Sequence, residues 1–289
     1  MQWKGRRQSS NVQNGGRGAK KGVAIGGGGL LLGLLVFLLT GNPLAALNIG
    51  LQSRGAQQIQ QESITLTMQE KELYDYSRVV LADTEDAWHA ILSDYGKTYR
   101  EPKMVVFQEN VKSGCGIASS GVGPFYCGID QAIYIDLSFY NTLIRDFQVK
   151  EGDFILSYVI SHEVGHHIQN ELGILNRVHS QQRRLNQENA NSLSVRLELQ
   201  ADYLAGVVAR YQDQNGYLDT GDVEEAIRTA WAIGDDTIQK KYQGQVQPES
   251  FTHGTGDQRI RWFQLGYQTG DLSNYNTFDT DKYPTIRDL

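Results

Sequence analysis

The sequence has few cysteines and an uneven distribution of charge. Its 289 residues include only two cysteines and no CxxC pair, which argues against a redox motif or a cysteine-rich metal site. The first 61 residues contain seven Lys/Arg and no acid, whereas the remaining 228 carry 20 basic and 33 acidic groups, a net charge of -13. An acidic body presents few cations to a phosphate backbone, so we exclude nucleic acid as a partner.

One long stretch has no charged residue. Residues 22–53 contain no Asp, Glu, Lys or Arg, and the run VAIGGGGLLLGLLVFLLTG within them has about the length of one membrane span. A cleaved signal peptide is the alternative, but the 21 polar residues before the run are too many and no small-x-small cleavage site follows it. Six basic residues precede the run and only Arg54 follows closely. The positive-inside rule therefore predicts a single-pass plasma-membrane protein with a cytoplasmic N-terminus and a periplasmic or extracellular body.

The chain is long enough to bury a core, and it divides into four predicted regions. These are a disordered basic cytoplasmic tail at 1–21, a transmembrane helix at 22–41, a linker at 42–69 and a folded domain at 70–289. Cys115 and Cys127 flank a turn-rich loop in that domain. Outside the cytoplasm they are expected to form a disulfide, which would stabilise the fold by about 3 kcal/mol.

The spacing of apolar residues predicts an α+β domain that is mainly helical. Helices are expected at about 70–92, 153–172, 183–212, 221–242 and 256–268. Between the first two, the runs MVVF and AIYIDL are typical of short strands and lie among glycine-rich loops. We therefore predict a small sheet of two or three strands beside the helices.

Three of the six histidines lie close together, in the segment SHEVGHHIQ. His162 and His166 are four residues apart, so on a helix both imidazoles point from one face and can reach one metal ion. Glu163 lies beside them, near the open position of such an ion. His167 points about 100° away from His166, and we interpret it as a structural histidine.

The alternative is a surface helix with a polar stripe. The flanking residues argue against it, because apolar side chains surround much of the predicted helix and indicate that it is buried. They are Ile155, Val159, Ile160, Val164 and Ile168. Buried histidines and a buried glutamate are costly without partners, and a metal ion supplies one.

A catalytic zinc site needs three protein ligands and one open position. The segment SVRLELQADYLAG offers Glu198 as the third ligand, and Asp202 lies one helical turn further on. Asp202 can accept a hydrogen bond from the distal N–H of a ligand histidine and fix its tautomer. An ordinary solvated acid pair is the alternative, but the apolar neighbours of both residues favour burial.

Four segments together resemble the bacterial neutral zinc metallopeptidase family, whose members have one N-terminal membrane anchor. They are SHEVGHHIQN, LELQADYLAG, CGIDQAIYIDLSFY and FTHGTGDQRIRW. The resemblance extends over nearly the whole chain, and HExxH followed by ExxxD is also the pattern of gluzincins. It implies a zincin-like catalytic domain with a small sheet packed on the active-site helix. It also implies Zn²⁺ held by His162, His166 and Glu198, with Glu163 as general base and Asp202 as partner of a ligand histidine.

Two further predictions concern the substrate. His253, in a loop before the last helix, is our expected oxyanion donor, with Tyr203 as the alternative donor. A helix-capping turn at Thr252 and His253, with Arg259 and Arg261 in structural salt bridges, is the alternative without a catalytic role. The strand that contains Tyr134 and Ile135 is expected either to bind an extended substrate at a sheet edge or to be a buried structural strand.

The sequence thus predicts a membrane-anchored zinc endopeptidase that cleaves proteins outside the cytoplasm. The alternative is a protein-binding module at the membrane that uses the same cleft without cleaving. The presence of Glu163 favours the enzyme, because a binding module has no need of a general base.

Overall fold

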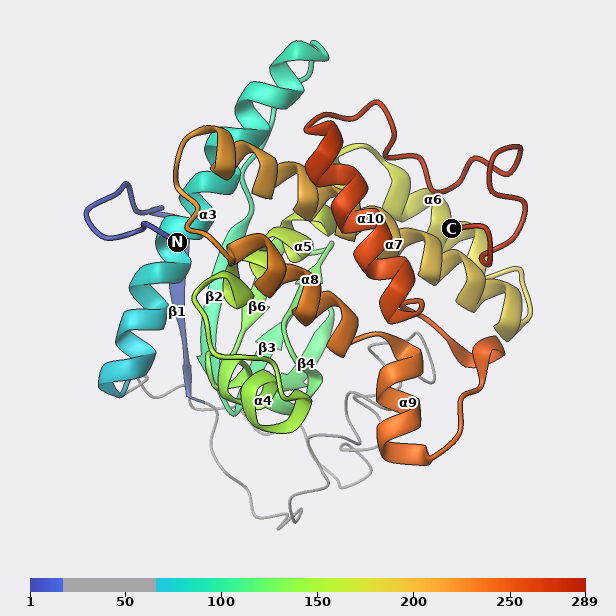
Figure 1. Ribbon diagram of the computed structural model, residues 1–289, viewed down its shortest axis with the longest axis horizontal. Coiled ribbons are helices and arrows are strands. Elements are labelled where there is room, and N and C mark those ends of the chain that lie inside the picture. The colour runs from blue at the N-terminus through green and yellow to red at the C-terminus, as the bar shows by residue number, and fades with distance from the viewer. Residues whose placement is uncertain (18–65) are drawn as a thin grey trace.

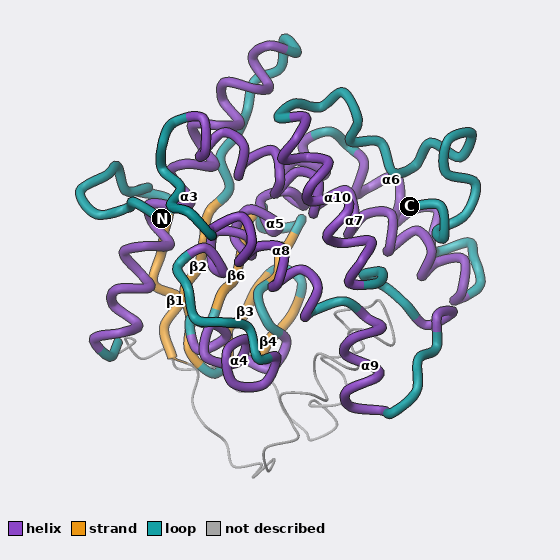
Figure 2. The backbone as a smooth tube through the Cα atoms, viewed as in Figure 1, coloured by secondary structure: helices purple, strands orange, loops and turns teal. Residues whose placement is uncertain are grey.

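The computed structural model describes residues 1–17 and 66–289, and within them the fold is mainly helical (Figure 1). The described helices are α3 (Met68–Asp94), α4 (Ser138–Phe147), α5 (Phe154–Glu171), α6 (Ile174–Gln182), α7 (Gln187–Gln214), α8 (Asp222–Ala232), α9 (Asp235–Gln243) and α10 (Gly256–Thr269). The strands are β1 (Val12–Arg17), β2 (Lys103–Gln108), β3 (Asn110–Ser113), β4 (Gly116–Ser119), β5 (Phe125–Cys127) and β6 (Ala132–Ile135). After α10 the chain ends in a long irregular segment (Figure 2).

Local sequence explains where the main helices begin. Thr67 and Glu70 form a capping box at the start of α3, and Thr255 and Gln258 form another at the start of α10. The side chain of Asn186 caps α7. Each of these side chains accepts a hydrogen bond from a backbone N–H that the helix itself leaves unpaired.

Four strands form one sheet in the order β1-β2-β6-β5. β1, β2 and β6 are parallel, whereas β5 is antiparallel to β6. β3 and β4 pair separately as an antiparallel hairpin. The four-stranded sheet therefore has β1 at one edge and β5 at the other, and β6 is internal.

The two inner strands, β2 and β6, are covered on both faces because they alternate apolar side chains between two cores. Met104 and Ile133 belong to the large core that includes the helices. Phe107 and Tyr134 lie in a second, smaller core with side chains of the β3–β4 hairpin. Helix α5 contacts β5 and β6 on one side and α7 and α3 on the others, and α10 packs along α7.

The predicted α+β, mainly helical class is confirmed, with differences in detail. The helix expected at 221–242 is two helices, α8 and α9, because the chain turns at Ile233 and Gly234. The short helices α4 and α6 were not predicted, and the sheet has more strands than expected. The predicted disulfide between Cys115 and Cys127 is present.

The prediction of a disordered tail at 1–21 is wrong for its described part. Residues 1–17, which we call the N-terminal arm, pack against the rest of the protein. The backbone of β1 pairs with β2 from Val12↔Met104 onward. The Arg7 guanidinium lies 2.9 Å from the carboxylate of Glu85 and 2.8 Å from that of Asp86. The basic residues of the arm thus neutralise acids on α3.

This packing overturns the predicted membrane topology and localisation. A single crossing at 22–41 would place residues 1–17 and 66–289 on opposite sides of a membrane, yet both contribute strands to one sheet. The predicted span and nearly all of the predicted linker lie outside the described residues. In the part of the chain that the structure describes, no helix has the length and apolar character needed to cross a bilayer.

Candidate metal centre

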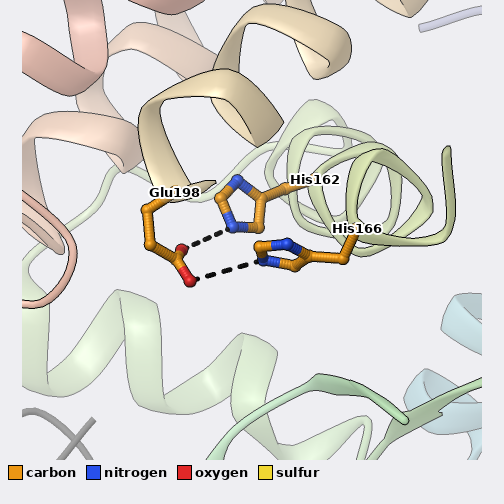
Figure 3. A group of neighbouring side chains, drawn as sticks. All are labelled: His162, His166 and Glu198. Carbon is orange, nitrogen blue, oxygen red and sulfur yellow. Dashed lines mark hydrogen bonds and ion pairs between the residues drawn. The ribbon is translucent and has the colours of Figure 1, made fainter. Parts of the chain in front are cut away.

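Two packed helices bring the predicted ligands together (Figure 3). His162 and His166 project from successive turns of α5, and Glu198 points toward both from α7. The Nε2 atoms of His162 and His166 lie 3.1 and 3.5 Å from the two carboxylate oxygens of Glu198. One potential ligand atom from each residue lies within 4.8 Å of the others. Two imidazoles and one carboxylate form a ligand set that suits zinc.

Gly165, inside the HExxH segment, permits the close approach of these helices. A Cβ atom at this position would lie 3.0 Å from the backbone oxygen of Ala201 and 3.1 Å from its Cα. A larger residue would push α5 away from α7. The glycine therefore helps to place Glu198 within reach of both histidines.

The orientation of His162 is fixed from behind by a buried network. Asp202 Oδ1 lies 2.8 Å from His162 Nδ1 and accepts a hydrogen bond from it, so Nε2 faces Glu198 and the metal position. Arg259 of α10 donates to both oxygens of Asp202, at 2.8 and 3.0 Å. The hydroxyl of Tyr158 donates to Asp202 Oδ1 at 2.6 Å. Burial alone would raise the pKa of Asp202, but Arg259 and His162 lower it to about 2.

His166 is oriented in an equivalent way by an amide. Its Nδ1 atom lies 2.9 Å from Oε1 of Gln169, and the amide nitrogen of Gln169 donates to the backbone oxygen of Leu197 at 2.7 Å. Gln169 is fully buried. Both histidines thus present Nε2 to the same point, with Nδ1 used in a hydrogen bond.

The charges around the cluster call for a cation. Burial lowers the pKa of His162, but Asp202 and Glu198 together raise it to about 10. Burial also lowers the pKa of His166, and Glu198 raises it above its usual range. The carboxylates thus favour positive charge at this position, and a bound divalent ion would supply it.

Glu163 and the metal cluster line one cleft, with a cavity volume of about 780 Å³. Burial raises the pKa of the Glu163 carboxyl, and the nearby His166 and His162 oppose that shift. Within the described part of the chain its carboxylate accepts no hydrogen bond. Glu163 is therefore available to a molecule in the cleft.

His253 also reaches the cluster, as its predicted role requires. Its Nε2 lies 3.9 Å from a carboxylate oxygen of Glu198, and its side chain lines the cleft. The capping role proposed as the alternative belongs instead to Thr255. The alternative donor Tyr203 bonds to the backbone oxygen of Asp271 at 3.0 Å and does not line the cleft.

Asp235, at the start of α9, holds the loop that carries His253. Its Oδ2 atom accepts hydrogen bonds from the backbone N–H groups of residues 252, 253 and 254 at 2.7, 2.6 and 3.1 Å. Its other oxygen lies 3.4 Å from Nδ1 of His253. Sequence analysis missed this residue, as it missed Gln169 and Tyr158, because nothing local connects Asp235 with a loop 18 residues further on.

The prediction that Tyr134 and Ile135 bind substrate at a sheet edge is wrong. β6 lies between β2 and β5, Tyr134 stacks on Phe125 in the smaller core and Ile135 is fully buried in the large core. The edge strand beside the metal helix is β5, whose residues Phe125 and Tyr126 line the cleft. The alternative reading, a buried structural strand, describes β6 correctly.

A largely buried cluster of two histidines and a glutamate in a cleft, with a second glutamate beside it, defines a candidate mononuclear metal site of hydrolytic type. The family model described as "Putative neutral zinc metallopeptidase" matches residues 1–278. The chain belongs to this family, and its membership supports a hydrolase at that coarse level.

Its relatives span most of its length. The uncharacterized protein YpfJ of Escherichia coli (strain K12) is 44% identical over 287 residues, which cover 96% of this chain and 99% of that protein. The uncharacterized protein Rv2575 of Mycobacterium tuberculosis (strain ATCC 25618 / H37Rv) is 41% identical over 211 residues, 69% of each chain. No solved structure matches.

Proposed function

We propose that this protein is a zinc endopeptidase that hydrolyses internal peptide bonds of protein substrates. His162, His166 and Glu198 would hold the ion, and the convergence of their three side chains in the cleft is the observation that carries the proposal. When bound, zinc lowers the pKa of a water ligand to about 7 and polarises a carbonyl. The remaining steps fall to side chains of this chain.

Glu163 serves as general base. Its carboxylate lines the cleft beside the two histidines, and burial raises its pKa toward the working range of a base at neutral pH. It takes the proton of the attacking water and then delivers that proton to the leaving amine. The same carboxylate is thus returned to its starting state after each cleavage.

His253 stabilises the oxyanion that develops on the attacked carbonyl. Its Nε2 faces the cluster, and Asp235 accepts from its backbone and lies near its Nδ1. A donor held in place before the reaction needs no reorganisation when the charge appears.

The shape and charge of the cleft favour internal bonds. β5 is an edge strand, so an extended peptide can pair with its backbone while side chains enter the cleft. Among the described residues that line the cleft, Arg183 is the one Asp, Glu, Lys or Arg besides Glu163, Glu198 and Arg259. An enzyme that removes terminal residues needs a charged group to hold the free terminus near the metal.

The second candidate is a binding module that holds proteins in this cleft without cleaving them. The position of Glu163 favours the enzyme, because a buried carboxylate without a hydrogen bond destabilises the fold and a module for binding alone has no use for it.

The test uses the full-length chain, its zinc content and the cleavage of unfolded, fluorescein-labelled casein. Glu163→Gln is expected to lower the cleavage rate by about 10²–10⁴-fold while zinc remains at one per chain. Glu171→Gln is the matched control, because Glu171 lies on the same helix but pairs with Arg100. Equal inertness of wild type and Glu163→Gln, with zinc bound to both, would support the binding module. Absence of bound zinc would refute the site itself.

A further inference from the structure

His167 lies next to the ligand His166 but takes no part in the metal cluster. Its side chain is fully buried. Its Nε2 donates to the backbone oxygen of Arg100 at 2.6 Å, so its Nδ1 is an acceptor. That Nδ1 lies 2.9 Å from the hydroxyl of Tyr126 and accepts a hydrogen bond from it. The residue is thus a connection between the metal helix α5 and the edge strand β5.

A second residue of α5 holds the same hydroxyl. The side-chain amide of Asn170 donates to Tyr126 Oη at 3.1 Å, and Asn170 lies one turn after His167 on the same helix face. Tyr126 therefore donates one hydrogen bond to α5 and accepts another. We call Tyr126, His167 and Asn170 the β5 latch.

The rest of β5 is fixed on its other side. Its three residues pair with β6, and Cys127 is joined to Cys115 by the disulfide. The strand is thus anchored to the sheet and to the turn of the β3–β4 hairpin, where Cys115 lies, while the latch is its polar connection to α5. The side chain of Tyr126 also lines the cleft.

We infer that His167 is a positioning residue that sets the separation between the substrate edge and the metal helix. The inference rests on the proposed function, in which an extended peptide lies along β5. The peptide carbonyl must then reach the metal position on α5, and an error of about 1 Å can cost roughly 100-fold in rate. Because none of the latch hydrogen bonds involves a ligand side chain, its loss alters the placement of the substrate and leaves the metal in place.

The experiment compares two tyrosines on either side of His167. Tyr126→Phe removes the latch hydroxyl. Tyr99→Phe is the matched control, because the ring of Tyr99 also packs edge-on against His167 but its buried hydroxyl has no hydrogen-bond partner in the described part of the chain. We measure zinc content, kcat and KM on fluorescein-labelled casein, and deuterium exchange of the amides at 122–128 with β2 as internal reference.

Tyr126→Phe is expected to lower kcat about tenfold with KM nearly unchanged, and to speed exchange at 122–128 but not in β2. Tyr99→Phe is expected to match wild type. His167→Asn retains an acceptor near the position of Nδ1, so its kcat and its exchange rate at 122–128 are expected to stay close to wild type. His167→Leu is expected to behave like Tyr126→Phe.

Three results would overturn the inference: equal exchange and kcat in Tyr126→Phe and Tyr99→Phe, loss of zinc from Tyr126→Phe, or faster exchange at 122–128 without a change in kcat. If wild type cleaves no substrate while Tyr126→Phe still loosens 122–128, the latch stands and the proposed function fails. The exchange measurement therefore separates the two.

Discussion

Arg259 donates hydrogen bonds to both carboxylate oxygens of Asp202, and both side chains are almost completely buried. Asp202 in turn holds His162, so a cation on α10 controls the orientation of a ligand on α5 through an acid on α7. Counted outward from the metal position, His162 comes first, Asp202 second and Arg259 third. It connects the C-terminal helix to the chemistry of the cleft.

Arg259→Met should therefore weaken zinc binding although it replaces no ligand. The substitution leaves the Asp202 carboxylate buried and only partly paired, which is expected to cost about 3–5 kcal/mol of unfolding free energy. Zinc affinity is expected to fall about 10–100-fold, measured by competition with a fluorescent chelator. Arg261→Met is the matched control, because Arg261 is exposed on the same helix and donates to the backbone oxygen of Asp288. Wild-type affinity in Arg259→Met would contradict this account.

Replacement of His162 should abolish zinc binding, whereas replacement of a histidine in the cleft that is not a ligand should not. His162→Ala is expected to abolish stoichiometric zinc and the rise in melting temperature that zinc gives wild type. His179 lines the same cleft but lies outside the cluster, so His179→Ala should retain both. Equal zinc content in the two variants, measured by atomic emission after dialysis, would place the metal elsewhere.

Asp235→Asn tests the support of His253. The neutral amide is a weaker acceptor for three backbone N–H groups, so we expect a loss of about 1–3 kcal/mol in unfolding free energy. The loop that carries His253 then loses its fixed geometry, and kcat is expected to fall about 10–100-fold. Asp236 is the neighbouring control, because it accepts from the Gly256 N–H alone. Similar rates in Asp235→Asn and Asp236→Asn would show that His253 needs no such support.

Stability should depend on pH through Asp83. Burial raises the pKa of its carboxyl from 3.8 to about 6, although Gln212 and Arg6 oppose the shift. The folded state thus binds the proton more tightly than the unfolded state. The stabilisation is fully present below pH 3.8 and is lost as the pH rises through about 6, a change on the order of 3 kcal/mol.

Urea unfolding between pH 4 and 7 measures this effect. Asp83→Asn has no proton to lose, so its unfolding free energy is expected to fall less over that range than that of wild type. Asp86→Asn is the control, because Asp86 is an exposed acid on the same helix that pairs with Arg7. A wild-type slope in Asp83→Asn would assign the pH dependence to other groups.

Features with a local signal were predictable from the sequence. The fourfold spacing of His162 and His166, and of Glu198 and Asp202, requires only that each pair lie on a helix. The disulfide followed from two lone cysteines close in sequence. The helices α3, α5, α7 and α10 have apolar periodicity or caps that mark them.

Features that depend on distant partners were not predictable in this way. β5 has only three residues in a glycine-rich segment, too few for a periodic pattern. The sequence therefore favours the more apolar β6 as the sheet edge that binds substrate. The N-terminal arm has a basic, glycine-containing composition typical of disorder, and its order comes from acids some 75 residues away on α3. His167 is one residue from a ligand, yet its partners are Tyr126 and Arg100.

Because β1 pairs with β2, residues 18–65 join one edge strand of the sheet to the chain that supplies the other three strands. A protease that cuts the chain within them should not release a peptide, because the strand pairing and the ion pairs of Arg7 would hold the two fragments in a complex. Conversely, a chain that starts at residue 66 would leave the edge of β2 bare. A synthetic peptide of residues 1–17 should then bind it and restore the missing strand.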